Sequence, residues 1–394
     1  MRLPQYVSLI LERLESSGEA AYVVGGGLRD RLLGKEPHDY DIATSALPQK
    51  TREVFEKAPI GAHVHDTGIK HGTVTVVIGG YPVEVTTFRV DISYSDSRHP
   101  DAVAFTDRIE EDLSRRDFTV NAMAYSPTRG FVDVFGGRED LDAGIIRAVR
   151  DPDERFREDA LRILRAFRFS AQLGFSIHQD TLDAAIRQRA GMSALSAERI
   201  CSELLRLLAS HDPSAPLLQM LHNGILPFIL GSYTPSERLI SLLPQMQASS
   251  AARLGFLLWE ADEDIARDIL NSLKCSNRDK TEALAVRRGA SFTLSRPKDA
   301  PRLTALTGVY APYALRASIL LGNSPADGEI LLAQSQAPTS VSQLAVSGRD
   351  MMALGAKGKD IGVTLNALLQ AVMDDPSLNT KEALLSLAEK ILKA

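Results

Sequence analysis

The chain has 394 residues, which is long enough for two or three domains with sizeable cores. Hydrophobic residues make up 44% and charged residues 24%, so the composition excludes a disordered or fibrous protein. The net charge of −5 gives no overall attraction to nucleic acid or to anionic membranes. Any site for a polyanion must therefore be local.

Signals for targeting and for disulfide bonding are absent from the sequence. No apolar run reaches the ~18 residues that a membrane span needs, and residues 1–18 lack the apolar stretch of a signal peptide. Cys201 and Cys275 belong to no Cys-x-x-Cys pair, which predicts neither a zinc site nor a disulfide framework. We expect a cytoplasmic protein without a membrane partner.

The first elements alternate between helix and strand. Residues 5–15 have helical apolar spacing, and residues 20–24 form a short apolar run that ends in three glycines. The pattern predicts a helix over residues 28–33 and a second short strand over residues 39–43.

A hairpin is predicted next. Residues 72–78 and 81–88 are rich in Val and Thr and flank Gly79-Gly80, which is typical of two strands joined by a two-residue turn. The polar residues 90–103 are expected to form an exposed loop, and residues 109–125 a helix.

From residue 151 onward, apolar residues recur at intervals of three and four, which predicts helices. We therefore expect an α+β protein. A mixed β-sheet head occupies residues 1–138, and all-helical segments cover residues 139–210, 211–334 and 335–394.

The glycine run Gly25-Gly26-Gly27 lies between a predicted strand and a predicted helix. Without Cβ atoms, its backbone N–H groups can approach phosphate oxygens, and the helix N-terminus adds partial positive charge. The run is neither a P-loop nor a dinucleotide fingerprint, because the further residues of those motifs are absent. It predicts a phosphate-binding turn of another kind.

Asp39 and Asp41 are two positions apart on a predicted strand, so their carboxylates share a face. A hard cation such as Mg²⁺, carrying substrate phosphates, would relieve their repulsion. Glu84 becomes a third carboxylate at this site if its strand pairs beside them. Alone, such residues are more often an exposed acidic pair and a solvent-facing Glu; the neighbouring glycine turn favours the metal site.

Asp117 and Asn121 are spaced i, i+4 on the predicted helix and follow Arg116. Together they offer donors and acceptors that suit a ribose and its phosphates. A surface ladder of salt bridges is the alternative for this segment.

The segment 155–165 reads as a helix with one charged face. Asp159 and Arg162, spaced i, i+3, are expected to hold each other's rotamers and to complement the Watson–Crick edge of a base. Arg165 lies on the same face, and seven arginines between residues 147 and 168 make the region locally basic. A solvated charge ladder is again the alternative.

Taken together, these motifs resemble a known family, the class II tRNA nucleotidyltransferases. These are the CCA-adding enzymes, close relatives of bacterial poly(A) polymerases within the polymerase-β-like superfamily. The resemblance covers about the first 205 residues, and a weaker one lies at SGRDMMALGAKGKDIG. The motifs that carry it are VVGGGLRDRLLG with HDYDIAT, HGTVTV with VEVTTFR, DLSRRDFTVNAMAY, DVFGGREDLDAGIIRAV and RFREDALRILRAFRF.

The resemblance implies a polymerase-β-like head followed by a helical neck, body and tail. The implied reaction is template-independent addition of C, C and A to the 3′ end of tRNA from CTP and ATP, with release of pyrophosphate. A bacterial poly(A) polymerase, an enzyme adding only CC or only A, and a non-catalytic RNA-binding protein are the alternatives.

Roles for individual residues also follow from the resemblance. Catalysis with two Mg²⁺ ions is assigned to Asp39 and Asp41, supported by Glu84. Nucleotide binding is assigned to Gly25, Gly26, Arg29, Arg116, Asp117, Asn121, Asp159, Arg162 and Arg165. The resemblance further implies a flexible loop over residues 91–100 that includes Arg98, and a hinge at Asp133, Gly136 and Gly137.

Overall fold

The computed structural model describes residues 1–56, 61–93 and 102–393. The chain forms two compact units. The first consists of residues 1–207 and 219–228, and the second of residues 208–218 and 229–394. The division into head, neck, body and tail remains a prediction.

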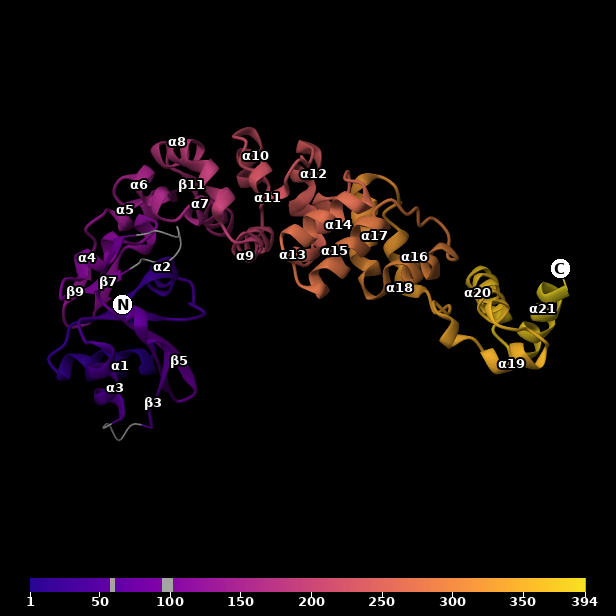
Figure 1. Cartoon of the computed structure of the whole chain (residues 1–394), viewed down its shortest axis with the longest axis horizontal. Helices are drawn as coiled ribbons and strands as arrows, with labels where there is room; N and C mark the ends of the chain where they lie inside the picture. Colours follow the sequence, from indigo (N-terminus) through magenta and orange to yellow (C-terminus); the bar gives the residue numbers. More distant parts are fainter. Residues whose placement is uncertain (57–60, 94–101, 394) are drawn as a thin grey trace. The chain divides into compact units, whose positions relative to one another are not determined.

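A mixed sheet is the centre of the first unit (Figure 1). Its strands are β1 (Ala21–Val24), β2 (Asp41–Thr44), β3 (His63–Gly68), β4 (Thr73–Ile78), β5 (Tyr81–Thr87), β8 (Ala124–Ser126) and β9 (Gly130–Val132). The strand order is β3-β4-β5-β2-β1-β8-β9. Strands β2 and β5 run parallel, and the other neighbours are antiparallel.

Two smaller sheets accompany it. Strand β6 (Arg89–Ser93) pairs antiparallel with β7 (Ala102–Phe105), and β10 (Ile145–Ile146) pairs parallel with β11 (Ser176–Ile177). The expected loop over residues 90–103 is therefore wrong at both ends, where residues 90–93 and 102–103 belong to strands. Residues 94–101, with Arg98, lie outside the described residues.

The large sheet is buried on both faces at β1. Ala21 and Val23 belong to one apolar core, and Tyr22 and Val24 belong to the core on the other face. Side chains alternate along a strand, so a continuous apolar run fills both cores. The predicted hairpin is confirmed: β4 and β5 pair through Gly79-Gly80, both of which have positive φ.

Helices of the first unit cover this sheet and extend beyond it. They are α1 (Gln5–Ser16), α2 (Gly25–Leu32), α3 (Pro48–Glu56), α4 (Ile109–Ser114), α5 (Gly137–Ala143), α6 (Pro152–Glu158), α7 (Leu161–Leu173) and α8 (Gln179–Gln188). Across the boundary between the units run α9 (Ala197–Leu208), α10 (Ser214–His222) and α11 (Pro227–Leu230).

Two predicted helices are interrupted. The expected helix over residues 109–125 is wrong: α4 ends at Ser114, and a short 3-10 helix, η2 (Thr119–Asn121), precedes strand β8. The segment 155–165 is also not one helix, because Asp159 is extended, with φ −149° and ψ 102°, between α6 and α7.

The described part of the second unit is helical. Its helices are α12 (Glu237–Leu242), α13 (Ser250–Leu257), α14 (Glu263–Ser272), α15 (Asn277–Gly289), α16 (Asp299–Thr307), α17 (Ala311–Leu321), α18 (Gly328–Gln334), α19 (Gly348–Ala353), α20 (Lys359–Asp374) and α21 (Lys381–Lys393). The last three share an apolar core that includes Met351, Leu368 and Leu384. None of the described helices is long and apolar enough to cross a membrane. A mixed-sheet head followed by helices confirms the predicted α+β class.

Candidate active site

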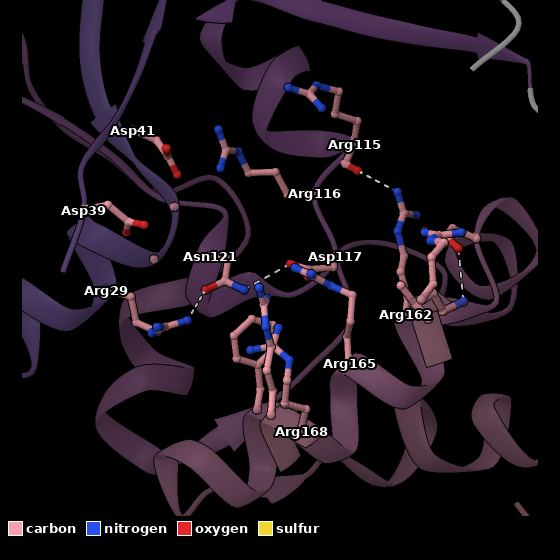
Figure 2. Close-up of a pocket in the computed structure, with 17 residues that line it drawn as sticks. Arg29, Asp39, Asp41, Arg115, Arg116, Asp117, Asn121, Arg162, Arg165 and Arg168 are labelled. Carbon is pink, nitrogen blue, oxygen red and sulfur yellow. Dashed lines mark hydrogen bonds and ion pairs between the residues drawn. The ribbon is translucent and has the colours of Figure 1, made fainter. Parts of the chain in front are cut away.

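One cavity of about 510 Å³ in the first unit gathers nearly all of the predicted site residues (Figure 2). It is lined by Gly25, Gly26, Arg29, Asp39, Asp41, Arg115, Arg116, Asp117, Asn121, Asp159, Leu161, Arg162, Arg165, Arg168, Phe169, Arg199 and Arg206. Among the predicted site residues, Glu84 alone is not part of this lining. Segments that are distant in sequence, from residue 25 to residue 206, therefore build a single site.

The glycine turn lies directly against the acidic segment. Gly25 has a φ of +71°, and a Cβ at this position would lie 3.1 Å from Nη1 of Arg116 and 3.3 Å from Oδ2 of Asp41. Helix α2 begins at Gly25 without a side-chain cap, so its first N–H groups remain available to an anion. This geometry leaves room for a phosphate group at the turn, and phosphate binding there remains a prediction.

Gly27 has a structural role that the sequence reasoning missed. A Cβ on Gly27 would lie only 2.6 Å from the carbonyl oxygen of Asp39 and 3.3 Å from Cα of Tyr40. Glycine is therefore required where α2 packs on the backbone that carries the carboxylates. The third consecutive glycine in the sequence could have indicated this close packing.

Asp39 and Asp41 both face the cavity, as their spacing predicts. Strand β2 begins only at Asp41, yet the alternation already holds before it: Tyr40 is 2% exposed and lies in the core. Figure 2 shows both carboxylates directed into the same space as the Arg116 guanidinium. Glu84 is the register partner of Asp41 on the parallel strand β5, as expected for a third nearby carboxylate.

The acidic pair has the electrostatics of a cation site. Burial, with a contribution from the charges of Glu84 and Asp39, raises the pKa of Asp41 to about 6 against the opposing effect of Arg116. A hard cation would relieve this repulsion, and oxygen is its preferred ligand atom. The described residues contain no ready-made cluster of three metal-ligating side chains. The pair therefore fits an ion that takes its other ligands from substrate and water.

Asp112 holds the two arginines beside the acidic pair, a role that was not predicted. Its buried carboxylate accepts hydrogen bonds from Arg115 at 2.8 and 2.9 Å and from Arg116 at 3.3 Å. Burial opposes ionisation, but the two guanidinium groups overcome it and lower the pKa of Asp112. The i, i+3 and i, i+4 spacing of these residues was a usable signal.

Asp117 and Asn121 meet as predicted, although on a turn and the 3-10 helix η2 rather than on an α-helix. Asn121 Nδ2 donates to Asp117 Oδ1 at 3.1 Å, and Asn121 Oδ1 accepts from Arg29 at 2.7 Å. Arg165 donates to Asp117 Oδ2 at 2.6 and 2.9 Å. Burial alone would raise the pKa of Asp117, but Arg165 and Asn121 together lower it to about 2.

An aromatic ring organises the arginines of the cavity. The guanidinium carbons of Arg29, Arg165 and Arg168 lie 5.2, 5.3 and 3.9 Å from the centroid of the Phe169 ring. Cation–π attraction partly offsets the repulsion among three like charges. Phe169 and Arg168 were not predicted, because their proximity to Arg29 arises only in the folded chain.

The expected direct pairing of Asp159 with Arg162 is wrong. Among the described residues, Asp159 instead accepts a hydrogen bond from Arg199 at 2.7 Å. Arg162 donates to Glu158 at 2.6 Å and to the carbonyl oxygen of Arg115 at 3.1 Å. The break between α6 and α7 separates the two partners, since Asp159 Oδ1 caps the N–H of Leu161. Both side chains still line the cavity, each in a fixed position.

The predicted hinge residues surround the start of α5. Asp133 accepts hydrogen bonds from the backbone N–H groups of Gly137, at 2.7 Å, and Arg138, at 2.8 Å, so it caps the helix. Gly136 precedes the helix with a φ of +72°. Motion at this point remains a prediction.

Comparison with known proteins agrees with this geometry. Residues 21–147 match the model of the poly A polymerase head domain, and residues 174–235 match a probable RNA- and SrmB-binding site of polymerase A. The chain is 35% identical to the CCA-adding enzyme of Lactiplantibacillus plantarum, over 97% of this chain and 95% of that protein. It is 34% identical to the CCA-adding enzyme of Ligilactobacillus salivarius, over 98% and 96% of the two chains.

A solved structure is similar over the whole chain. The crystal structure of the Bacillus stearothermophilus CCA-adding enzyme in complex with CTP has a TM-score of 0.86 and 31% identity, over 100% of this chain and 98% of the other. The fold and the site thus define a nucleotidyltransferase with a polymerase-β-like head. Such a transferase uses a divalent metal ion. The chain belongs to the CCA-adding enzyme family, which confirms the predicted resemblance.

Proposed function

We propose that this chain adds C, C and A to the 3′ end of tRNA, using CTP and ATP and no nucleic-acid template. The relatives named above, which are similar over nearly the full length, support this function. The observation that carries it is a single cavity lined by Asp39 and Asp41, by Asp159, and by eight arginines that include Arg162. The cytoplasm is the proposed location, since Cys201 and Cys275 are buried and belong to no Cys-x-x-Cys pair.

Asp39 and Asp41 would hold Mg²⁺, with Glu84 as a supporting negative charge. Mg²⁺ suits this pair because it binds oxygen, keeps several waters and commonly shares its ligands with substrate phosphates. When bound, it lowers the electrostatic barrier to attack on a phosphate and to departure of pyrophosphate.

The side chains of the cavity position the two reactants. Arg29 and the N-terminus of α2, at Gly25 and Gly26, bind the triphosphate. Arg116, Asp117 and Asn121 orient the ribose. The 3′-hydroxyl of tRNA forms a new bond to the α-phosphorus, while the bond from that phosphorus to pyrophosphate breaks. The protein contributes mainly orientation and charge.

Base selection is assigned to Asp159 and Arg162, with Arg165 nearby. Arg162 keeps a fixed guanidinium through its bonds to Glu158 and to backbone carbonyl groups, and Asp159 keeps a fixed acceptor through Arg199. A donor and an acceptor held in this way can replace a templating base. We assign residues 1–138 to catalysis, 139–210 to nucleotide recognition, 211–334 to a helical body and 335–394 to tRNA binding.

The test uses tRNA that lacks its last three nucleotides. CTP alone should yield two additions, ATP alone should not extend this end, and both together should yield three additions and then stop. Long A tracts would identify a poly(A) polymerase instead, and a stop after CC with both nucleotides would identify a CC-adding enzyme. Absence of any incorporation with Mg²⁺ would leave only an RNA-binding protein.

A further inference from the structure

A second cavity, of about 420 Å³, opens next to the first. The two linings have only Asp39 and Asp41 in common. Beyond this shared pair, the second cavity is lined by Glu84, by three tyrosines, Tyr6, Tyr40 and Tyr81, and by His38, Thr75 and Pro82. The carboxylate pair thus forms the boundary between two spaces.

The two cavities differ in the charge of their linings. Eight arginines line the first, whereas the described residues that line the second include neither arginine nor lysine. Asp39, Asp41 and Glu84 make the second cavity acidic, so it does not fit a triphosphate. It fits a group that contacts a cation on the carboxylates and offers an uncharged surface elsewhere.

Part of the lining of the second cavity is aromatic. The rings of Tyr6 and Tyr81 stack with centroids 4.6 Å apart and an interplanar angle of 6°. Tyr81 is 57% exposed, although it begins strand β5 directly after the tight Gly79-Gly80 turn. Tyr6 lies on α1, next to the fully buried Val7. The exposed Tyr81 ring is therefore anchored through its backbone, directly after the turn, and through Tyr6, which stacks against one of its faces.

The geometry of phosphoryl transfer requires two approaches to the same carboxylates. The attacking and leaving oxygens lie roughly in line on opposite sides of the phosphorus. If the arginines hold the triphosphate, the acceptor end must approach Asp39 and Asp41 from another side. The second cavity provides that approach.

We propose that Tyr81, backed by Tyr6, stacks on the 3′-terminal base of the acceptor tRNA and so positions its 3′-hydroxyl at Asp39 and Asp41. This inference rests on the proposed function. The acceptor ends in a different nucleotide as CCA is built, so its site must accept different bases in turn. Stacking on an aromatic ring meets this need, because every base has a π-face. Tyr81 is thus a positioning residue and not a catalytic one.

Kinetics with the full-length protein and tRNA lacking CCA test the assignment. Tyr81→Ala should raise the KM for tRNA about tenfold, which is typical of losing one stacked base, and leave the KM for CTP unchanged. Tyr81→Phe keeps the ring and should behave as the wild type. The matched control is Phe131→Ala, which removes a 42% exposed ring from β9, an edge strand separated from β5 by three strands. An unchanged KM for tRNA in Tyr81→Ala, or an equal rise in both KM values, would overturn the proposal.

A modified acceptor provides a second test that requires no variant to fold. A tRNA whose terminal nucleotide lacks its base should have a KM about tenfold higher with the wild-type chain. With Tyr81→Ala the missing base should have little further effect, because both changes remove the same contact. Two independent, multiplying losses would refute the stacking contact. Failure of the wild type to extend normal tRNA would instead refute the proposed function.

Discussion

Asp41 is the residue on which the separate parts of the site converge. It is the first residue of β2 and lies beside the glycine turn. Its register partner is Glu84 on the neighbouring parallel strand β5. Arg116, held by Asp112, is the compensating cation in the structure. Four segments of the chain thus surround one carboxylate: β2 itself, the glycine turn, β5 and the segment that carries Asp112 and Arg116. Together they set the ionisation of Asp41.

Replacing Asp41 with Asn should abolish incorporation, with a loss of about 100-fold or more in kcat. The amide keeps the shape but not the charge that retains a divalent ion. CTP binding should remain, because the arginines that hold the triphosphate are untouched; calorimetric titration without metal measures this. Asp142→Asn, at an exposed position on α5, is the matched control. Appreciable activity of Asp41→Asn would remove the metal assignment.

Arg199 belongs to the site although no local pattern includes it. Arg199→Ala should release Asp159 and reduce the preference for CTP and ATP over UTP and GTP by roughly tenfold, the cost of one well-placed pair of hydrogen bonds. Asp159→Ala should have the same effect. Competition assays with paired nucleotides measure the preference, and the exposed Arg157→Ala is the control. Unchanged selectivity in Asp159→Ala would exclude a templating role.

At the scale of elements, the site depends on where helices begin and end. Helix α2 starts on the glycine turn, α4 ends before Asp117, and the break between α6 and α7 presents Asp159. The helices and strands fix where each side chain points into the cavity. The functional groups themselves come from the residues at the ends of these elements.

Gly27→Ala tests the packing of α2 on the acidic segment. The added methyl group would overlap the carbonyl oxygen of Asp39, so the backbone must shift at a destabilising cost of roughly 1–3 kcal/mol. We expect a fall in kcat of at least about tenfold, because the carboxylates move with that backbone. Gly362→Ala, which meets nothing within 4 Å, should leave activity and thermal stability unchanged. A fully active Gly27→Ala would show that this contact is not required.

Sequence patterns predicted the elements that depend on local chemistry. The hairpin followed from Val/Thr runs around Gly79-Gly80, and the common direction of Asp39 and Asp41 followed from alternation. The partner of Asp159 could not be predicted in this way, because Arg199 is 40 residues distant in sequence. Likewise, Phe169 meets Arg29 only after α7 packs beside the sheet. Spacing identifies neighbours on one element, whereas tertiary packing selects partners between elements.

At the scale of the whole molecule, a net charge of −5 coexists with a cavity that contains eight arginines. Buried acids compensate them within the first unit: Asp112 binds Arg115 and Arg116, and Asp117 binds Arg165. Site electrostatics and folding stability are therefore coupled through the same ion pairs.

Asp117 should make the free energy of unfolding depend on pH in the acidic range. Its pKa of about 2 in the folded chain lies below the ordinary value of 3.8, so the folded state favours the ionised form. The resulting stabilisation, about 2 kcal/mol, is complete above pH 5 and is lost as the pH falls toward 2. Urea unfolding followed by circular dichroism should show that Asp117→Asn is less stable at pH 7 and loses less stability between pH 5 and pH 3. An equal loss in both proteins would contradict the assignment.

Arg29, which is proposed to bind the triphosphate together with the N-terminus of α2, also bears on how a catalytic cycle ends. Pyrophosphate leaves with negative oxygens like those of the bound triphosphate, so the groups proposed to bind the nucleotide would also hold the by-product. Pyrophosphate must then dissociate before the next nucleotide can bind. Accumulated pyrophosphate would compete with CTP and ATP for the same binding site.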